Sequence, residues 1–216
     1  MIVGLSGLIG SGKGSVAQIL VNEYGYKQMS FAGSLKDAVS SIFGWDRSLL
    51  EGDTKESRAW RETVDTWWAK KLNIPHLTPR WILQHFGTDV VRHHFCDDIW
   101  MLSLENKLRN TKANVVISDV RFPNEIKVIR DLNGSCVRVM RGADPDWCSD
   151  ARVACSNSSH ATQAKAHLSL MGIHESEWAW YLTVFDYVVE NNGTLDDLRG
   201  ATHRLVDHLS STESLV

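Results

Sequence analysis

The chain has 216 residues, of which 43% are hydrophobic and 23% charged, and its formal net charge is −3 at pH 7. This length and composition predict one globular domain, residues 1–216, and exclude a disordered or fibrous chain. Because 26 acidic residues outnumber the 23 lysines and arginines, we expect no nucleic-acid polymer as a partner. No membrane span or targeting segment is predicted, so we expect a cytoplasmic protein whose four cysteines are reduced.

Strand and helix patterns alternate along the chain, which predicts an α/β fold with a mostly parallel, five-stranded sheet. The apolar segments expected to form strands are residues 1–5, 27–31, 115–117, 135–140 and 184–189. The segments with helical periodicity are residues 13–24, 34–43, 56–72, 79–94, 97–110, 123–132 and 195–209.

Capping residues mark several of these helix ends. Thr78 followed by Pro79 is a typical helix start, and the helix that it opens is disturbed at Gly87. Gly134 is expected to cap the helix that ends near residue 132. Thr194 with Asp197 three residues later resembles a capping box, and residues 210–216 are expected to fray.

Between residues 141 and 178 the periodicity fails, and no strand is predicted there. A loop of this length inside a compact domain is usually functional or mobile. Near its end, residues 174–177 resemble a helix start in which Glu177 is a cap partner. The segment also holds two cysteines and two histidines, but their spacing lacks the close pairs typical of structural zinc, so we do not expect a zinc site at Cys148, Cys155, His160 and His167.

A glycine-rich loop, Gly7-Leu8-Ile9-Gly10-Ser11-Gly12-Lys13-Gly14-Ser15, follows the first strand and opens the first helix. Such a loop turns backbone N–H groups and a helix N-terminus toward phosphate oxygens, and its lysine adds a positive charge. The expected phosphate ligands are Gly10, Ser11, Gly12, Lys13, Gly14 and Ser15. The usual pattern has Ser or Thr directly after the lysine; here Gly14 stands there, so Ser15 is the expected hydroxyl ligand of Mg²⁺.

A second set of polar residues follows the clearest central strand. Asp119 and Arg121 come directly after residues 115–117, at the sheet edge where ligands of open α/β sheets bind. An arginine there can bind a phosphate through two N–H groups of its planar guanidinium. Glu125 lies on the first turn of the next helix. The alternative is that Glu125 is only a helix-dipole partner and Arg121 only a surface residue.

Arg80 and Gln84 are four positions apart and share one helical face, just before Gly87-Thr88-Asp89. The Gln84 amide can read a base edge, and Arg80 can hold a phosphate or stack on a base. Trp100 can stack on a base or sugar, although spacing alone favours core packing for it.

Taken together, these segments resemble the deoxynucleoside monophosphate kinases of tailed bacteriophages, which are relatives of the adenylate-kinase fold. Besides the phosphate loop and Trp100, the matching segments are residues 31–38, 80–89, 118–121, 137–141 and 192–198. The resemblance implies a three-layer P-loop NTPase fold within a single kinase domain. It also implies a helical insert that binds the monophosphate, at about 44–110, and a lid at about 142–177.

The family pattern, carried onto this sequence, implies a role for each site residue. Lys13, Asp119 and Arg121 would be catalytic, and Arg141 would meet the donor phosphates. The residues implied for the acceptor are Lys36, Arg58, Arg80, Gln84, Thr88, Trp100, Asp119, Arg121 and Glu125. Arg61 is an alternative to Arg58. The family's basic residues before the second half of the loop are replaced here by Leu8-Ile9-Gly10, so loop contacts to the acceptor are not implied.

The implied reaction is transfer of the γ-phosphoryl group of ATP, with Mg²⁺, to a deoxynucleoside 5′-monophosphate of the dGMP, dTMP or dCMP type. A dephospho-coenzyme A kinase is the nearest alternative, but it usually has Ser or Thr where Gly14 stands. A non-catalytic nucleotide-binding module is a second alternative. The tryptophans leave a homodimer open.

Overall fold

The computed structural model describes residues 1–213, and it divides into two compact units. The first, called here the sheet unit, comprises Met1–Ser30 and the chain from Leu108 onward. The second, called the helical unit, is Phe31–Lys107.

A five-stranded sheet forms the centre of the sheet unit. Its strands are β1 (Ile2–Ser6), β2 (Lys27–Met29), β3 (Val115–Ile117), β4 (Ser135–Met140) and β5 (Tyr187–Glu190). Their order is β2-β3-β1-β4-β5, and every neighbouring pair is parallel. In the register, Val3 lies opposite Val116 of β3 and Ser135 of β4. The predicted parallel α/β sheet is therefore confirmed, with β1 at its middle.

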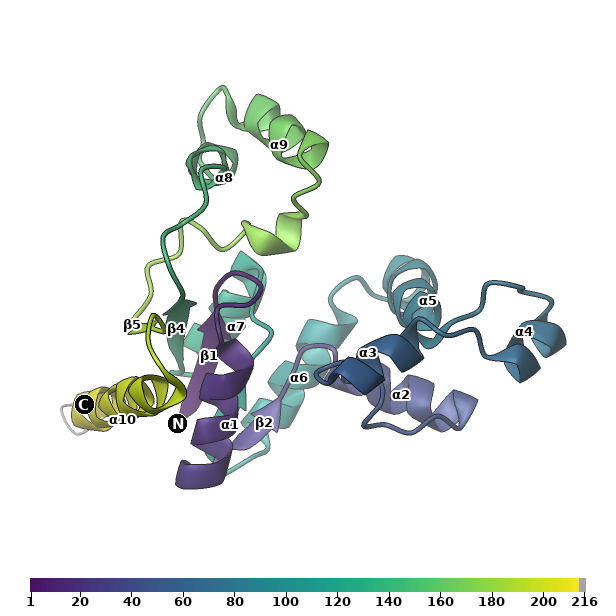
Figure 1. The fold of residues 1–216 in the computed structure, drawn as a ribbon, viewed down its shortest axis with the longest axis horizontal. Coiled ribbons are helices and arrows are strands. Elements are labelled where there is room, and N and C mark those ends of the chain that lie inside the picture. Colours follow the sequence, from purple (N-terminus) through teal and green to yellow (C-terminus); the bar gives the residue numbers. More distant parts are fainter. Residues whose placement is uncertain (214–216) are drawn as a thin grey trace. The chain divides into compact units, whose positions relative to one another are not determined.

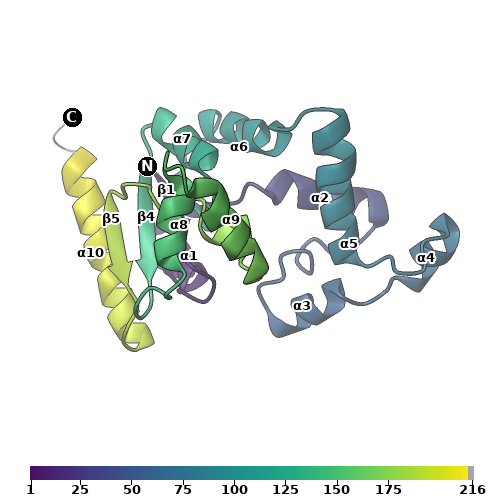
Figure 2. The ribbon, with the colours of Figure 1, turned by 90° about the horizontal axis from the view of Figure 1, so that it is seen from above.

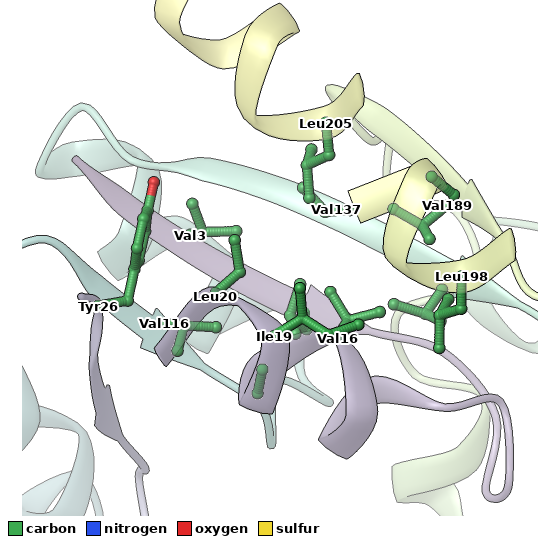
Figure 3. Close-up of a cluster of buried hydrophobic side chains, with 14 of the residues drawn as sticks. Val3, Val16, Ile19, Leu20, Tyr26, Val116, Val137, Val189, Leu198 and Leu205 are labelled. Atoms are coloured by element: carbon green, nitrogen blue, oxygen red, sulfur yellow. The ribbon is translucent and has the colours of Figure 1, made fainter. Parts of the chain in front are cut away.

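Two helices cover one face of this sheet, α1 (Lys13–Tyr24) and α10 (Leu195–Glu213). Figure 3 shows Val16 and Leu20 of α1 and Leu205 of α10 meeting Val3 and Val137 of the strands. Figure 2 shows α10 running alongside β5. Burying each such side chain contributes about 1.5–3 kcal/mol, so this cluster is a main source of stability.

The helix α7 (Pro123–Asp131) covers the opposite face, which completes three layers. Gly4 permits its close approach, because a Cβ at Gly4 would lie 2.4 Å from Cδ1 of Ile129. At the end of α7, Asn133 adopts a left-handed conformation (φ 56°), and the N–H of Gly134 donates to the backbone oxygen of Ile129 at 2.9 Å. Gly134 thus contributes the predicted capping bond, but Asn133 makes the left-handed turn.

The helical unit is built from short helices around tryptophans. They are α2 (Gly33–Phe43), α3 (Lys55–Arg61), α4 (Thr66–Leu72), α5 (Pro79–Gln84), the π-helix η1 (His85–Arg92) and most of α6 (Ile99–Arg109). Leu35, Leu50 and Ile82 are buried in its core, with Trp60 and Trp68 packed against them. As predicted, the Thr78 hydroxyl accepts the N–H of Trp81 at the start of α5. Gly87, where the sequence predicted a disturbed helix, lies in the π-helix η1.

The prediction of one helix over residues 56–72 is wrong, because α3 and α4 are separate. The α3 helix ends at Arg61, and the Asp65 carboxylate accepts the N–H groups of Trp67 and Trp68 at 3.1 and 3.0 Å. An acceptor in that position starts a new helix. The apolar residues of α3 and α4 are spaced as in one continuous helix, but the Asp65 cap starts a second helix.

Residues 141–178 contain helices where a loop was expected. These are α8 (Cys148–Cys155), α9 (Ala161–Leu170) and the short 3₁₀-helix η2 (Glu175–Glu177). The side chains that α8 and α9 bury are mostly small, such as Ala151, Ala154 and Ala164, which explains the weak periodicity.

The C-terminal predictions need two corrections. The last strand begins at Tyr187 and ends at Glu190, rather than spanning 184–189. The Thr194–Asp197 capping box is confirmed, but α10 runs on to Glu213, so residues 210–213 are helical rather than frayed. The prediction for residues 214–216 lies outside the described residues. None of the helices formed by residues 1–213 has the length and hydropathy needed to cross a membrane.

Candidate active site

The glycine-rich loop joins the end of β1 to the start of α1, in the purple part of Figure 1. Three of its glycines adopt backbone angles that other residues avoid, φ +140° at Gly7, +77° at Gly10 and +103° at Gly12. Two of them also lie close to neighbouring atoms. A Cβ at Gly7 would lie 2.3 Å from the backbone oxygen of Val139, and one at Gly12 would lie 2.3 Å from Nδ2 of Asn191. Only glycine fits both positions, so the loop path is set by its neighbours as well as by its own sequence.

Polar groups in and around this loop are left unsatisfied. Gly12 is the N-cap of α1 and has no side chain with which to cap the first N–H groups of the helix. The hydroxyl of Ser11 is buried and finds no hydrogen-bond partner among the described residues. Uncapped helix amides with an orphaned buried hydroxyl favour an anionic ligand at this position.

Lys13 lies folded back on the loop. Its Nζ donates to the backbone oxygens of Gly7 at 2.6 Å and Leu8 at 2.8 Å. Burial, with the neighbouring Arg121 charge, lowers the Lys13 pKa from 10.5 to about 8, whereas the Glu177 carboxylate opposes that change. Near neutral pH the side chain is therefore a partly desolvated cation, which strengthens its attraction for phosphate.

The segment after β3 carries Asp119, Arg121 and Glu125. One oxygen of Glu125 accepts the backbone N–H groups of Arg121 at 2.7 Å and Phe122 at 3.0 Å, so this carboxylate caps α7. Burial is the main reason that the Glu125 pKa rises to about 7, and the Asp119 charge adds to it. The helix-partner role of Glu125 is thus present, whereas Arg121 is more than a surface residue.

Arg121 is tied to the phosphate loop through Glu177. Its Nη1 pairs with Oε1 of Glu177, and Oε2 of the same carboxylate accepts the backbone N–H of Ile9 at 3.0 Å. Glu177 belongs to η2, a segment where the sequence indicated only a cap partner. The chain thus brings a loop amide and an arginine to one carboxylate, whose charge also raises the Lys13 pKa.

Asn191, directly after β5, is a second residue whose contact with the phosphate loop the sequence did not specify. Its Nδ2 donates to the backbone oxygen of Ser11 at 2.9 Å, and both residues are buried. The sequence signal was limited to an Asn-Asn-Gly turn after a strand, which does not specify what the amide contacts.

A cavity of about 210 Å³ adjoins the other side of the phosphate loop, with Arg138 and Arg141 in its lining. Arg138 is already engaged: it pairs with Asp144 and lies 5.2 Å from the ring centre of Trp180. The Tyr181 hydroxyl donates to the same Asp144 carboxylate. Arg141 is exposed, which leaves it accessible to a ligand.

The remaining predicted residues lie in the helical unit. Gln84 and Thr88 have exposed side chains. Trp100 packs against the tryptophan-rich core, where its Nε1 donates to the backbone oxygen of Gly87 at 3.0 Å. The three cationic candidates each have a partner within the unit: Lys36 with Glu51, Arg80 with Glu62, and Arg58 with the Asp53 backbone oxygen.

Metal-binding residues do not cluster in the described part of the chain, since no group of three His, Cys, Asp or Glu side chains there could hold an ion. Two of the residues at which no zinc site was expected have protein partners: His167 pairs with Asp150, and the Cys155 thiol donates to the Trp178 backbone oxygen. Ser15 is exposed on the first turn of α1. The Ser15 hydroxyl and the Asp119 carboxylate are both hard oxygen donors, and Mg²⁺ commonly binds proteins through one or two such groups besides nucleotide phosphates.

Known proteins similar to this chain include a protein family, two viral proteins and solved structures. A family model described as deoxynucleotide monophosphate kinase matches residues 64–201. A protein of Acanthamoeba polyphaga mimivirus, provisionally named a deoxynucleotide monophosphate kinase, is 28% identical over 97% of this chain and 98% of its own. The deoxynucleoside-5′-monophosphate kinase of Escherichia phage T5 is 28% identical over 62% of this chain and 73% of its own. Among solved structures, shikimate kinase from Aquifex aeolicus covers 99% of this chain and 98% of its own at 12% identity and a TM-score of 0.49, a level that carries no inference.

Proposed function

The chain belongs to the deoxynucleotide monophosphate kinase family, and from this premise we propose how its own residues transfer the γ-phosphoryl group of ATP to a deoxynucleoside 5′-monophosphate. It is a phosphotransferase of the P-loop kinase type, with a deoxynucleotide monophosphate as acceptor. What remains to be assigned is the part that each residue plays.

One observation carries the assignment: the Ile9 amide and the Arg121 guanidinium both bind the same Glu177 carboxylate. The phosphate loop and the segment after β3 therefore lie within reach of one small anion. Phosphoryl transfer needs little covalent chemistry from a protein, and positioning with charge neutralisation supplies most of the catalysis. The loop with Lys13 and the segment with Arg121 are both cationic. Their proximity supports the proposal that a donor phosphate and an acceptor phosphate bind next to each other.

In the proposed mechanism, the backbone of Gly10–Ser15 and the Lys13 ammonium hold the donor phosphates and stabilise charge that develops on them. Arg141 joins them from the segment after β4. Arg121 holds the acceptor phosphate and offsets the repulsion between the two anions. No strong general base is required, because the attacking acceptor oxygen is already anionic.

The Ser15 hydroxyl and the Asp119 carboxylate are oxygen donors of the type that Mg²⁺ binds, and they would hold the ion. When bound, the ion neutralises charge on the phosphate oxygens. This chain's own contribution would be to supply those two oxygen ligands from the first turn of α1 and from the segment after β3.

From the family resemblance, we assign the rest of the acceptor monophosphate site to Lys36, Arg58, Arg80, Gln84, Thr88, Trp100 and Glu125. We retain the single-domain organisation, with the monophosphate-binding insert at about 44–110 and the lid at about 142–177, as part of this proposal.

Both viral relatives support a cytoplasmic location in an infected cell. A homodimer stays a prediction, which a measurement of mass in solution would check.

The decisive experiment is an acceptor panel. The purified full chain is given ATP·Mg²⁺ with dGMP, dTMP, dCMP, the matching ribonucleotides or dephospho-coenzyme A, and ADP formation is followed. We expect ADP only with deoxynucleoside monophosphates, and none from Lys13→Ala with any acceptor. Turnover with dephospho-coenzyme A alone would favour the rival kinase. Binding of ATP without turnover on any acceptor would favour a non-catalytic nucleotide-binding module.

A further inference from the structure

Glu177 is an acidic side chain that contacts both the phosphate loop and Arg121, and the mechanism above does not use it. Its side chain is only 19% exposed, and its two carboxylate oxygens contact different elements. Oε1 pairs with Arg121, and Oε2 accepts the Ile9 N–H at 3.0 Å. The neighbouring Ser176 hydroxyl lies 3.3 Å from the same Arg121 nitrogen.

A capping role does not account for this geometry. The N-cap of η2 is His174, whose Nδ1 accepts the N–H of Ser176 at 3.2 Å. Glu177, at the other end of η2, directs its carboxylate to groups 168 and 56 positions away in the chain. The side chain therefore serves the phosphate loop and Arg121 and not its own helix.

The groups around the carboxylate are of the kind that bind phosphate oxygens. A loop amide and a guanidinium are both anion ligands, and the negative charge of Glu177 also acts on Lys13. A carboxylate and a phosphate compete for such groups because each presents anionic oxygens. In the absence of nucleotide, these cations would otherwise repel one another in a partly desolvated setting.

We propose that Glu177 is an internal anion of the phosphate site, which holds Arg121 and the Ile9 amide until a phosphate displaces it. The proposal deepens the function above and rests on one part of it, namely that this loop binds nucleotide phosphates. Displacement costs free energy, so the affinity of the site for phosphate is lower than its ligands alone would provide. It also couples phosphate binding to release of the segment around η2.

The first test measures anion binding with inorganic pyrophosphate as the probe, by titration calorimetry on the full chain. Glu177→Gln keeps the length of the side chain and an oxygen acceptor for the Ile9 N–H, but removes the charge. Glu175→Gln is the matched control, because Glu175 is exposed on the same short helix, and within residues 1–213 no hydrogen bond or ion pair joins its side chain to the loop. We expect Glu177→Gln to bind pyrophosphate about tenfold more tightly than the wild type, and Glu175→Gln to bind it within about twofold of the wild type.

A second measurement needs no variant and therefore does not depend on how Glu177→Gln folds. Hydrogen–deuterium exchange of the wild-type chain is followed with and without pyrophosphate. We expect uptake to fall in residues 7–13 and to rise in residues 174–178, because Glu177 leaves the loop when the anion arrives.

The opposite results would overturn the proposal. If Glu177→Gln bound pyrophosphate as weakly as the wild type or more weakly, or if exchange at residues 174–178 fell or did not change, Glu177 would be a structural or ligand-binding group instead. Neither readout involves a monophosphate. A chain that fails the acceptor panel but shows both effects would therefore contradict the proposed reaction and not this inference.

Discussion

The Asn191 side chain donates a 2.9 Å hydrogen bond to the backbone oxygen of Ser11, and both residues are buried. Asn191 follows β5, the last strand of the sheet, so this bond joins the edge of the sheet to the phosphate loop (Figure 1). The same amide lies against Gly12, where a Cβ would be 2.3 Å from its nitrogen. Asn191 thus supports the loop through one hydrogen bond and one close packing contact.

Asn191→Ala should therefore weaken both the fold and the donor site. The change leaves a buried backbone oxygen without its partner, which costs about 1–3 kcal/mol, and it removes the support of Gly12. We expect urea unfolding at lower denaturant and weaker ATP binding. Asn192→Ala is the control, because Asn192 is exposed and accepts the Gly142 N–H instead. Equal stability and equal ATP affinity in the two variants would contradict this role.

The pH dependence of ATP use should report the ionisation of Lys13. Since the Lys13 pKa is about 8 in the free protein, the side chain is charged below that pH and becomes neutral above it. We expect kcat/KM for ATP to fall as pH rises through about 8. Lys13→Arg keeps the charge at every accessible pH and should lack this fall, whatever its absolute rate. A wild-type profile that stays level from pH 7 to pH 9.5 would disprove the assignment.

Glu125 should lower the free energy of unfolding as pH rises, whereas an acidic residue with a lowered pKa would increase it. Its pKa rises from 4.5 to about 7 in the folded protein, so the folded state binds the proton more tightly than the unfolded state. This contribution to stability is present below about pH 4.5 and is lost as pH rises through 7. Glu125→Gln removes it, so the wild type should lose up to about 3 kcal/mol relative to the variant across that range. Urea unfolding at several pH values measures the difference, and parallel curves would refute the prediction.

Arg121→Ala should separate acceptor use from donor binding. We expect kcat/KM for the monophosphate to fall about 10²–10³-fold, while ATP binding is largely retained, because Lys13 and the loop amides remain. The double variant Arg121→Ala/Glu177→Gln shows whether the unpaired Glu177 carboxylate contributes to the loss. Lys127→Ala, at an exposed position of α7, is the control. An unchanged kcat/KM for the monophosphate would show that Arg121 does not hold the acceptor.

Features that depend on neighbouring residues were predictable from the sequence. The Thr78 and Thr194 caps involve partners within three positions, and both are present. The order of strands and helices follows from hydrophobic periodicity, which is also local. The pattern was ambiguous where two local preferences competed, so the Asp65 cap divided what resembled one helix, and alanine-rich faces hid α8 and α9.

By itself, then, the sequence determined the parallel α/β class, the glycine loop with Lys13, and the position of Arg121 after a central strand, because spacing along the chain specifies all three. The tertiary structure alone decided that Glu177 reaches Ile9 across 168 positions and that Asn191 reaches Ser11 across 180. A glutamate at the end of a short helix and an asparagine after a strand are common, and their neighbours in sequence do not specify what they contact. Their roles arise only when packing of the sheet and its helices brings distant segments together, since a hydrogen bond requires proximity in space and not in sequence.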